Sequence, residues 1–334
     1  MEKILTVVVP VYNMERYLDQ CLQSLIPKKH RDVLEVLVID DGSGDSSVQI
    51  AGKYAEAFPE IFRVISKENG GHGSVLNRGI QEAEGTYLKI VDSDDWVDTD
   101  AFDRLLEYLL EDASGDIVYS NYYWVNEKNG KKKAEFPQPF AGVQYRSLYR
   151  LKDISEPYFL KMHGYTVRTA IMRRIPRIDE NCFYVDMEFV LFPVPFAETV
   201  EFLDEYVYMY RIGNAGQSMS PEKLRKNAAN YDRVLKRLLE YYRCWKKKGM
   251  DQARLSYMEH VLGRMTASRM KIFLTYPCRR KVEERMRKMD CSLYNRYREV
   301  YDAVKNPAVR ILRKTDYHLY PLARLMFYCR ERLR

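Results

Sequence analysis

Residues 85–98 read Gly85-Thr-Tyr-Leu-Lys-Ile-Val-Asp92-Ser-Asp94-Asp95-Trp-Val-Asp98. The apolar run before Asp92 predicts a buried strand, and the strand ends in a cluster of carboxylates. Neighbouring carboxylates stay ionised only if a cation or hydrogen-bond donors offset their repulsion. A divalent metal with oxygen ligands does this and leaves coordination positions for phosphate oxygens. The alternative interpretation is a solvated acidic turn. The loops that follow the other strands distinguish between a metal site and such a turn.

The composition is that of a soluble globular protein. The 334 residues are enough for one large domain with an appendage, or for two domains. No uncharged apolar run approaches the roughly 18 residues that a transmembrane helix needs, and the N-terminus lacks the features of a signal peptide. The six cysteines are scattered without a Cys-x-x-Cys pair, which argues against structural zinc and fits reduced thiols. We therefore expect a cytoplasmic protein.

The net charge of +7 is unevenly distributed along the chain. Residues 1–220 carry 24 Lys or Arg against 35 Asp or Glu, a net −11, whereas residues 221–334 carry 30 against 12, a net +18. A basic region attracts polyanions such as anionic lipid headgroups or a charged polymer. The alternative is a solvated helical surface that is rich in arginine.

Apolar runs alternate with amphipathic stretches over the first 120 residues. Strands are predicted at Ile4–Pro10, Val33–Ile39, Phe62–Ser66, Tyr87–Val91 and Asp116–Tyr123, and helices at Glu15–Leu25, Ser46–Ala57, Ser74–Ala83 and Ala101–Glu111. This alternation is typical of a parallel sheet covered on both faces, which binds ligands beyond the C-terminal ends of its strands. From Pro221 the spacing becomes helical, with an apolar seam from Leu224 to Trp245.

The loops that follow the first four strands share a chemistry. They read Pro10-Val-Tyr12-Asn13, Asp40-Asp41-Gly42-Ser43, Glu68-Asn69-Gly70-Gly71-His72-Gly73 and the Asp92 cluster. Together they offer an aromatic ring for stacking on a base, acids for base and ribose donors, glycines for close backbone approach, and metal ligands. Four such loops at successive strand ends favour a nucleotide site over an acidic turn.

This order of motifs resembles family 2 glycosyltransferases of the bacterial cell-surface polysaccharide type. The resemblance is dense over residues 3–125 and thin to about residue 220. It implies an α/β fold of the GT-A kind, Rossmann-like, with a mostly parallel sheet flanked by helices. We expect a GT-A domain over residues 1–220, with a nucleotide-sugar half (1–125) and an acceptor half (126–220), and a basic α-helical region over 221–334.

The resemblance also implies roles for single residues. Pro10 and Tyr12 would lie against the uracil ring of a UDP-sugar, and Asp41 or Asp40 would accept a hydrogen bond from the base. The segment with Asn69, Asn77 and Arg78 would face the ribose and diphosphate, although Leu76 stands where many relatives carry Arg. Asp92 would hold the ribose or the metal's outer shell, and Asp94 would ligate Mn²⁺ or Mg²⁺, with Asp95 close by.

Members of this family invert the anomeric carbon and need one carboxylate as a general base. Phe183-Tyr-Val-Asp186-Met-Glu188 matches the expected position, with Asp186 as the first choice and Glu188 as the second. Flanking aromatic residues would raise the pKa of such an acid and improve it as a base near neutral pH. The alternative is an ordinary Asp that caps a helix from Met187. The segment 210–220 resembles a flexible loop over the donor phosphates, with Arg211, Gln217 and Ser218 as donors.

The resemblance thus predicts an inverting, metal-dependent, hexosyltransferase-type enzyme acting on a glycan or lipid-linked acceptor. A dehydrogenase is excluded because no Gly-x-Gly-x-x-Gly follows the first strand. The remaining alternative is a polyanion- or membrane-binding module with a vestigial nucleotide site. Residues 308–334 are predicted to form a basic amphipathic helix on an anionic membrane, which would place the protein on the inner face of the cell membrane. We expect no nucleic-acid partner and leave homo-oligomers open.

Overall fold

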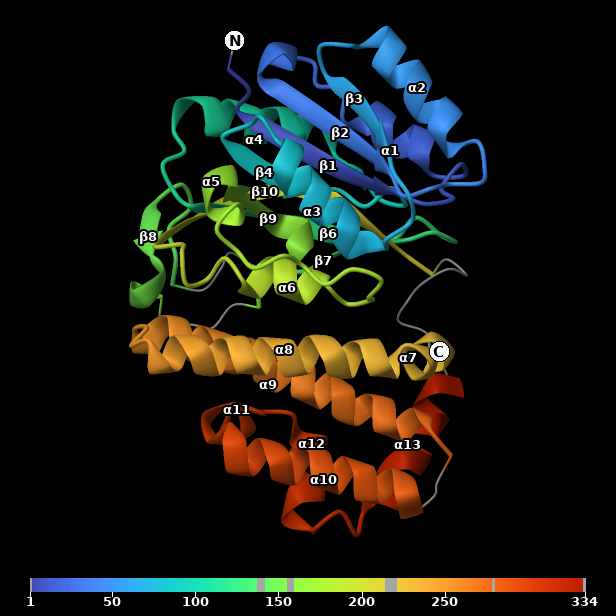
Figure 1. Ribbon diagram of the computed structural model, residues 1–334, viewed down its shortest axis with the longest axis vertical. Helices are drawn as coiled ribbons and strands as arrows, with labels where there is room; N and C mark the ends of the chain where they lie inside the picture. The colour runs from blue at the N-terminus through green and yellow to red at the C-terminus, as the bar shows by residue number, and fades with distance from the viewer. Residues whose placement is uncertain (1, 137–141, 155–158, 214–220, 278–279, 333–334) are drawn as a thin grey trace. The chain divides into compact units, whose positions relative to one another are not determined.

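The structure is a computed structural model that describes residues 2–136, 142–154, 159–213, 221–277 and 280–332. The chain divides into two compact units, one of residues 1–156 and 160–215, the other of residues 157–159 and 216–334. In the described ranges every strand belongs to the first unit, and the second is helical (Figure 1). No helix among the described residues is both long and apolar enough to cross a bilayer.

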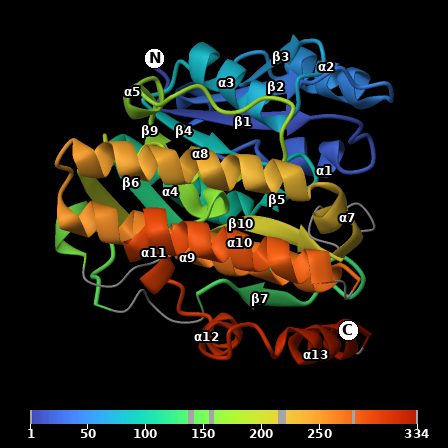
Figure 2. The ribbon, with the colours of Figure 1, turned by 60° about the horizontal axis from the view of Figure 1, so that its bottom comes forward.

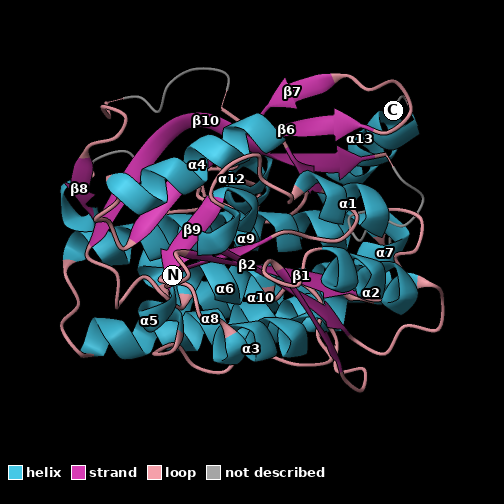
Figure 3. Ribbon diagram, turned by 90° about the horizontal axis from the view of Figure 1, so that it is seen from above, coloured by secondary structure: helices cyan, strands magenta, loops and turns pink. Residues whose placement is uncertain are grey.

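Ten strands of the first unit form one mixed sheet in the order β3-β2-β1-β4-β9-β6-β10-β5, with β7 beside β6 and β8 beside β10. The strands are β1 (Leu5–Val11), β2 (Leu34–Asp40), β3 (Phe62–Ser66), β4 (Tyr87–Ile90), β5 (Trp96–Val97), β6 (Ile117–Asn126), β7 (Lys132–Ala134), β8 (Leu148–Arg150), β9 (Tyr165–Arg168) and β10 (Thr199–Ile212). β1 to β4 are mutually parallel, as are β6 and β10, and β9 joins the two groups in the antiparallel sense (Figure 3). The predicted α/β fold with a largely parallel sheet between helices is confirmed.

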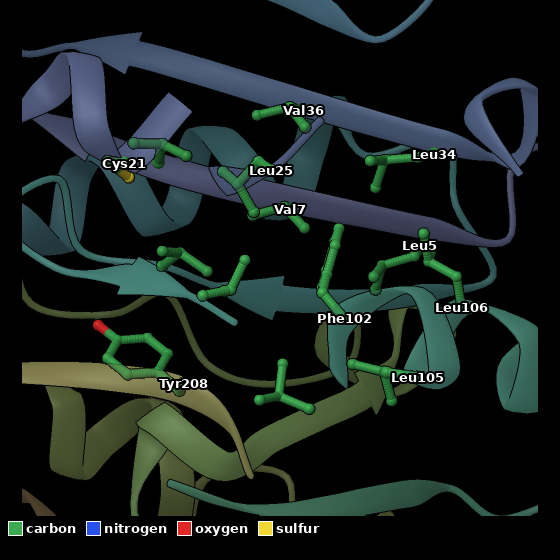
Figure 4. Packing of buried hydrophobic residues seen from close by; sticks show 14 of the residues in the cluster. Leu5, Val7, Cys21, Leu25, Leu34, Val36, Phe102, Leu105, Leu106 and Tyr208 are labelled. Atoms are coloured by element: carbon green, nitrogen blue, oxygen red, sulfur yellow. The ribbon is translucent and has the colours of Figure 1, made fainter. Parts of the chain in front are cut away.

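Helices cover both faces of this sheet, which is why its strands are apolar on both sides. The helices are α1 (Leu18–Ser24), α2 (Ser47–Ala57), α3 (His72–Glu82), α4 (Thr99–Glu111), α5 (Thr169–Met172) and α6 (Asp186–Leu191). Leu5, Val7 and Val36 pack with α1 and α4 in one core (Figure 4). On β1, Val8 alternates with these residues, and Gly79 of α3 approaches it so closely that a Cβ would lie 2.5 Å from a valine methyl. Val8 therefore points to the face that α3 covers.

The predicted element boundaries differ from the observed ones mainly where side chains take over backbone groups. The helix predicted from Glu15 begins at Leu18, because the Glu15 amide donates to Asp45 and the Met14 amide donates to Ser47. The helix predicted from Ser74 already begins at His72. The strand Phe62–Ser66 has the predicted bounds.

The second unit contains seven helices within the described ranges. They are α7 (Pro221–Lys226), α8 (Ala228–Lys247), α9 (Gln252–Thr275), α10 (Arg280–Arg296), α11 (Arg298–Asp302), α12 (Pro307–Lys314) and α13 (Tyr320–Arg332). α8 and α9 lie side by side as a helical hairpin (Figure 2). The apolar seam predicted from Leu224 is buried as far as Tyr242. It spans two helices, because the helix is interrupted at Asn227.

The single amphipathic helix predicted over residues 308–334 is wrong. The segment forms α12 and α13, because Asp316 and Tyr317 adopt positive φ angles of 43° and 63° that end α12. Arg313 is mostly buried and donates to both oxygens of Asp290, one of which also accepts from the Tyr317 hydroxyl. Part of the basic charge of this region therefore stabilises its own core.

Lys89 of β4 is a fully buried cation in the middle of the sheet. Its Nζ donates to the carbonyl oxygens of His163 at 2.8 Å and Tyr165 at 3.3 Å. Burial disfavours the charged ammonium and lowers the pKa of Lys89 to about 7. Near neutral pH the folded chain therefore holds Lys89 partly as a neutral amine.

We expect the stability of the protein to rise with pH because of Lys89. Above pH 7 the unfolded chain still binds the lysine proton, whereas the folded chain has released it, so the free energy of unfolding rises by up to about 1.4 kcal/mol per pH unit until about pH 10. Lys89→Met should remove this contribution, and Lys53→Met, at an exposed position of α2, should keep it. Urea unfolding at pH 7, 8 and 9 measures the free energy of unfolding as a function of pH. If this free energy rises equally with pH in the wild type and in Lys89→Met, the interpretation is contradicted.

Candidate active site

The structure brings the loops after the parallel strands to one edge of the sheet. The amide of Asp41 donates to Val11, the amide of Lys67 donates to Asp40, and the amide of Val91 donates to Val8. These hydrogen bonds continue the ladder past the strand ends, so the predicted strand-end loops are neighbours in space.

Asp41 fastens the glycine turn that follows β3. Its carboxylate is 3% exposed and accepts from Lys67 Nζ, from the Gly70 amide at 2.9 Å and from the Gly71 amide at 2.8 Å. Asn69 adds a hydrogen bond from Nδ2 to the Asp41 carbonyl. The hydrogen bond to a base, predicted for Asp41, has to compete with these internal donors.

The other predicted nucleotide contacts differ in exposure. Asp40 is buried and accepts from the amides of its own turn, at Gly42 and Ser43. Pro10 is buried within β1, whereas the side chain of Tyr12 is 49% exposed beside it. An exposed ring at a strand end is available for stacking on a planar ligand. The exposure of Tyr12 allows stacking, and its contact with a base stays a prediction.

Asn77 and Arg78 make protein contacts on α3. Asn77 Nδ2 donates to the Ile178 carbonyl and to Glu180, and its Oδ1 accepts from the Ile178 amide at 2.9 Å. All these partners are in the segment before α6. Arg78 pairs with Glu82, one turn further along α3. Asn77 therefore clamps the segment before α6 to α3 by hydrogen bonds. Its predicted contact with ribose or diphosphate stays a prediction.

Asp95 is the internal anchor of the carboxylate cluster. It is 1% exposed, and its oxygens accept from the Tyr208 hydroxyl at 2.6 Å and from the Arg211 amide at 2.7 Å. Burial, followed by the charges of Asp94 and Asp92, raises the pKa of Asp95 well above its usual value. Because both oxygens accept hydrogen bonds from β10, Asp95 fixes the position of the loop.

Asp92 and Asp94 flank this anchor and are more accessible. Asp92 Oδ1 lies 3.3 Å from His72 Nε2, and the Asp94 carbonyl accepts from Arg211 Nε. Burial would raise the pKa of Asp92, but the close contact with His72 outweighs burial and lowers it. An ionised Asp92 is suited to bind a cation.

His163 is a candidate ligand that the sequence did not reveal. One ligand atom each of Asp92, Asp95 and His163 lie within 4.8 Å of one another, and the buried Nδ1 of His163 has no hydrogen-bond partner among the described residues. Burial lowers the pKa of His163 to about 4, so its imidazole is neutral and able to ligate. No spacing rule singles out Met162-His163-Gly164; only the fold brings it here. Carboxylate oxygens with one imidazole fit a divalent metal ion.

Asp186 lies at the start of α6 within electrostatic reach of the cluster. Burial raises the pKa of Asp186, the positive charge of His72 lowers it, and the charge of Asp92 raises it further. Conversely, burial lowers the pKa of His72, but Asp92, followed by the charges of Asp186 and Asp94, outweighs burial and raises it, so His72 is within electrostatic reach of all three carboxylates. Glu188, the second choice for the base, is fully buried and accepts from the Asp179 amide at 2.8 Å. The geometry thus favours Asp186 over Glu188.

The segment before Asp186 packs against the glycine turn after β3 so closely that the glycines there have no space for a side chain. A Cβ at Gly73 would lie 2.0 Å from the Asp179 carbonyl oxygen, and a Cβ at Gly71 would lie 3.3 Å from the backbone of Asn181. The Asn181 amide also donates to the Gly70 carbonyl oxygen at 2.7 Å. The turn after β3 and the segment before α6 therefore form one rigid wall of the site.

Arg211 ends β10 beside the cluster. Its guanidinium lies between the rings of Tyr17 and Trp96, at 4.7 and 4.6 Å from the centroids, and donates to Gln20. The structure thus places Arg211 next to the cluster, whereas Gln217 and Ser218 lie outside the described residues.

Comparisons with known proteins agree on one family. The family model described as Glycosyl transferase family 2 matches residues 6–177. The chain is 34% identical over 217 residues to the uncharacterized glycosyltransferase EpsJ of Bacillus subtilis (strain 168), and 29% identical over 219 residues to glycosyltransferase GlyA of Streptococcus pneumoniae serotype 4. These matches span 63% and 62% of this chain, but only 62% of EpsJ and 30% of GlyA.

Solved structures of S. aureus TarS are similar over 97% of this chain. In one of them the similar region makes up 54% of the TarS chain, with a TM-score of 0.65 and 20% identity. In the structure of TarS residues 1–349 in complex with UDP it makes up 89% of that chain, with a TM-score of 0.64 and 21% identity. At this identity the likeness concerns the fold, and it confirms the predicted GT-A class.

We expect the hydroxyl of Tyr208 to stabilise the cluster measurably. Tyr208→Phe leaves one oxygen of the buried Asp95 without its donor, which should lower the free energy of unfolding by about 1–3 kcal/mol. Tyr122→Phe is the matched control, because Tyr122 is equally buried and its hydroxyl is not hydrogen-bonded to Asp95. Urea unfolding measures both variants; equal losses would show that the hydrogen bond to Asp95 contributes little.

Proposed function

The chain belongs to glycosyl transferase family 2, and on this basis we propose that it transfers a sugar from a UDP-sugar to a glycan or lipid-linked acceptor, with inversion at the anomeric carbon. The observation that carries the proposal is that the loops after β1 to β4 meet at one edge of the sheet, where Asp92 lies 3.3 Å from His72. An inverting transfer in one step needs carboxylates that hold a cation at the leaving diphosphate. It also needs a separate carboxylate that accepts the proton of the acceptor hydroxyl.

The donor is proposed from two sources. Tyr12 offers an exposed ring at the end of β1, and the glycine turn after β3 offers close backbone approach. In addition, structures of S. aureus TarS hold UDP and UDP-GlcNAc. We infer a uridine nucleotide sugar as donor, with Pro10, Tyr12, Asp40 or Asp41 near the base and Asn69, Asn77, Arg78 and Asp92 near ribose and phosphates.

A bound Mn²⁺ or Mg²⁺ would stabilise the negative charge that develops on the leaving diphosphate. Asp94 and Asp92 would hold the ion, and His163 offers a further donor atom next to Asp92. Asp95, with its oxygens occupied by Tyr208 and Arg211, keeps the loop in position.

Asp186 would act as the base. It accepts the proton of the acceptor hydroxyl while that oxygen bonds to the anomeric carbon; the bond to the phosphate oxygen breaks on the opposite side, and UDP leaves. The raised pKa of Asp186, caused first by burial, makes its carboxylate more basic than an exposed one. Its neighbour Glu188 is buried, so we propose that Glu188 supports the segment instead.

A contact with an anionic membrane surface stays a second proposal. On α13, the side chains of Leu322, Leu325 and Met326 are 51%, 60% and 65% exposed in a region of net positive charge. Apolar and basic side chains together favour binding to anionic lipid. Liposome co-sedimentation that does not change when all three residues are replaced by serine would exclude this contact.

We expect Asp186→Asn to separate binding from transfer. A UDP-sugar that raises the melting temperature in the presence of Mn²⁺ identifies the donor. Asp186→Asn should keep this shift but lose about 10²- to 10⁴-fold in kcat for transfer, because the amide cannot accept the proton. Asp94→Ala should lose the metal-dependent part of the shift as well.

Asp204→Asn is the matched control, since it replaces the same carboxylate by the same amide at an exposed position of β10. It should keep both donor binding and transfer. Full transfer activity in Asp186→Asn would remove the base assignment.

A further inference from the structure

Phe183 is an exposed aromatic residue close to the proposed base. Its side chain is 52% exposed, three residues before Asp186, although its neighbours Cys182 and Val185 are buried to 4% and 1% exposure. Large apolar side chains on a structured segment are normally buried. Here the buried neighbours fix the segment while Phe183 points outward.

The backbone of this segment is held in an uncommon conformation. Asn181 and Tyr184 have φ angles of 52° and 68°, in the left-handed region that bulky side chains such as tyrosine rarely adopt. Such strain persists only where the surroundings impose it, and it concentrates at functional sites. The surroundings are visible: the Asn181 amide binds Gly70, and Asn77 clamps Ile178.

Phe183 is therefore presented at a fixed place relative to the turn after β3 and to Asp186. In Figure 1, α3 and α6 lie next to each other in the first unit, with this segment leading into α6. An acceptor whose hydroxyl meets Asp186 has to lay the rest of its structure against the residues around Asp186. Phe183 is the large exposed apolar side chain there; the ring of Tyr184, 6.3 Å away between centroids, extends the aromatic surface.

We propose that Phe183 is the platform for the acceptor and that the acceptor presents a pyranose ring. The proposal rests on the function proposed above, because it takes Asp186 as the acceptor-side carboxylate. A pyranose has a face of C–H groups that packs on the flat, electron-rich face of an aromatic ring, while its hydroxyls stay at the polar rim. An open-chain polyol lacks such a face. The structure thus favours a glycosyl acceptor over a polyol acceptor.

Saturation-transfer NMR tests this without any donor. The probes are methyl β-D-glucopyranoside, methyl α-D-mannopyranoside and methyl N-acetyl-β-D-glucosaminide, with ribitol as the open-chain comparison. We expect the wild-type protein to saturate the ring protons of at least one pyranoside and not ribitol. Phe183→Ala should reduce that signal about fivefold, and Phe183→Tyr should keep it, because alanine removes the aromatic face on which the pyranose packs and tyrosine retains it.

Leu148→Ala is the control, because Leu148 is 53% exposed on the edge strand β8. It should leave the pyranoside signal unchanged. Melting temperatures of all variants verify folding, and a half-exposed side chain should change them little.

Three outcomes would overturn the proposal: no signal from any pyranoside, an equal signal from ribitol, or an unchanged signal in Phe183→Ala. The result is separable from the fate of the proposed function. If Asp186→Asn keeps full transfer while Phe183→Ala loses the signal, the base assignment fails, whereas the binding of a pyranose at Phe183 stands. If Asp186→Asn loses transfer and Phe183→Ala keeps the signal, the platform alone fails.

Discussion

The buried carboxylate of Asp95 is the constraint on which the first unit depends. An ionisable group with 1% exposure needs partners, and the protein supplies the hydroxyl of Tyr208 and the amide of Arg211, both from β10. These bonds fasten the loop after β4 to a strand more than a hundred residues further along the chain. Asp92 and Asp94 can therefore be accessible and close together without the loop giving way to their repulsion.

A second long-range connection complements the first. The carboxylates after β4 belong to the parallel half of the sheet, whereas Asp186 comes from a segment that follows β9. His72, at the start of α3, lies 3.3 Å from Asp92, and Asn77 on the same helix is hydrogen-bonded to the segment before α6. One helix thus aligns both sides of the site, because its first turn meets the carboxylates and its second turn meets the backbone of the other wall.

The sequence predicts what depends on local pattern and misses what depends on partners. The strand Phe62–Ser66 and the acidic loop after Tyr87–Val91 follow from apolar runs and their ends, and both are found close to the predicted positions. The inward orientation of Asp95, the clamping role of Asn77 and the approach of His163 to Asp92 depend on residues from β9, β10 and the segment before α6. The break between α12 and α13 escaped prediction because it results from two left-handed residues that are not glycine.

The close approach of Gly73 to Asp179 has a consequence for the variability of this protein. With no space for even a methyl group at that point, the turn after β3 and the segment before α6 can change only together. A chimera that exchanges residues 69–77 with those of a relative, but keeps residues 177–188, would bring mismatched surfaces into contact. An exchange with a relative should therefore succeed only when both segments are transplanted together.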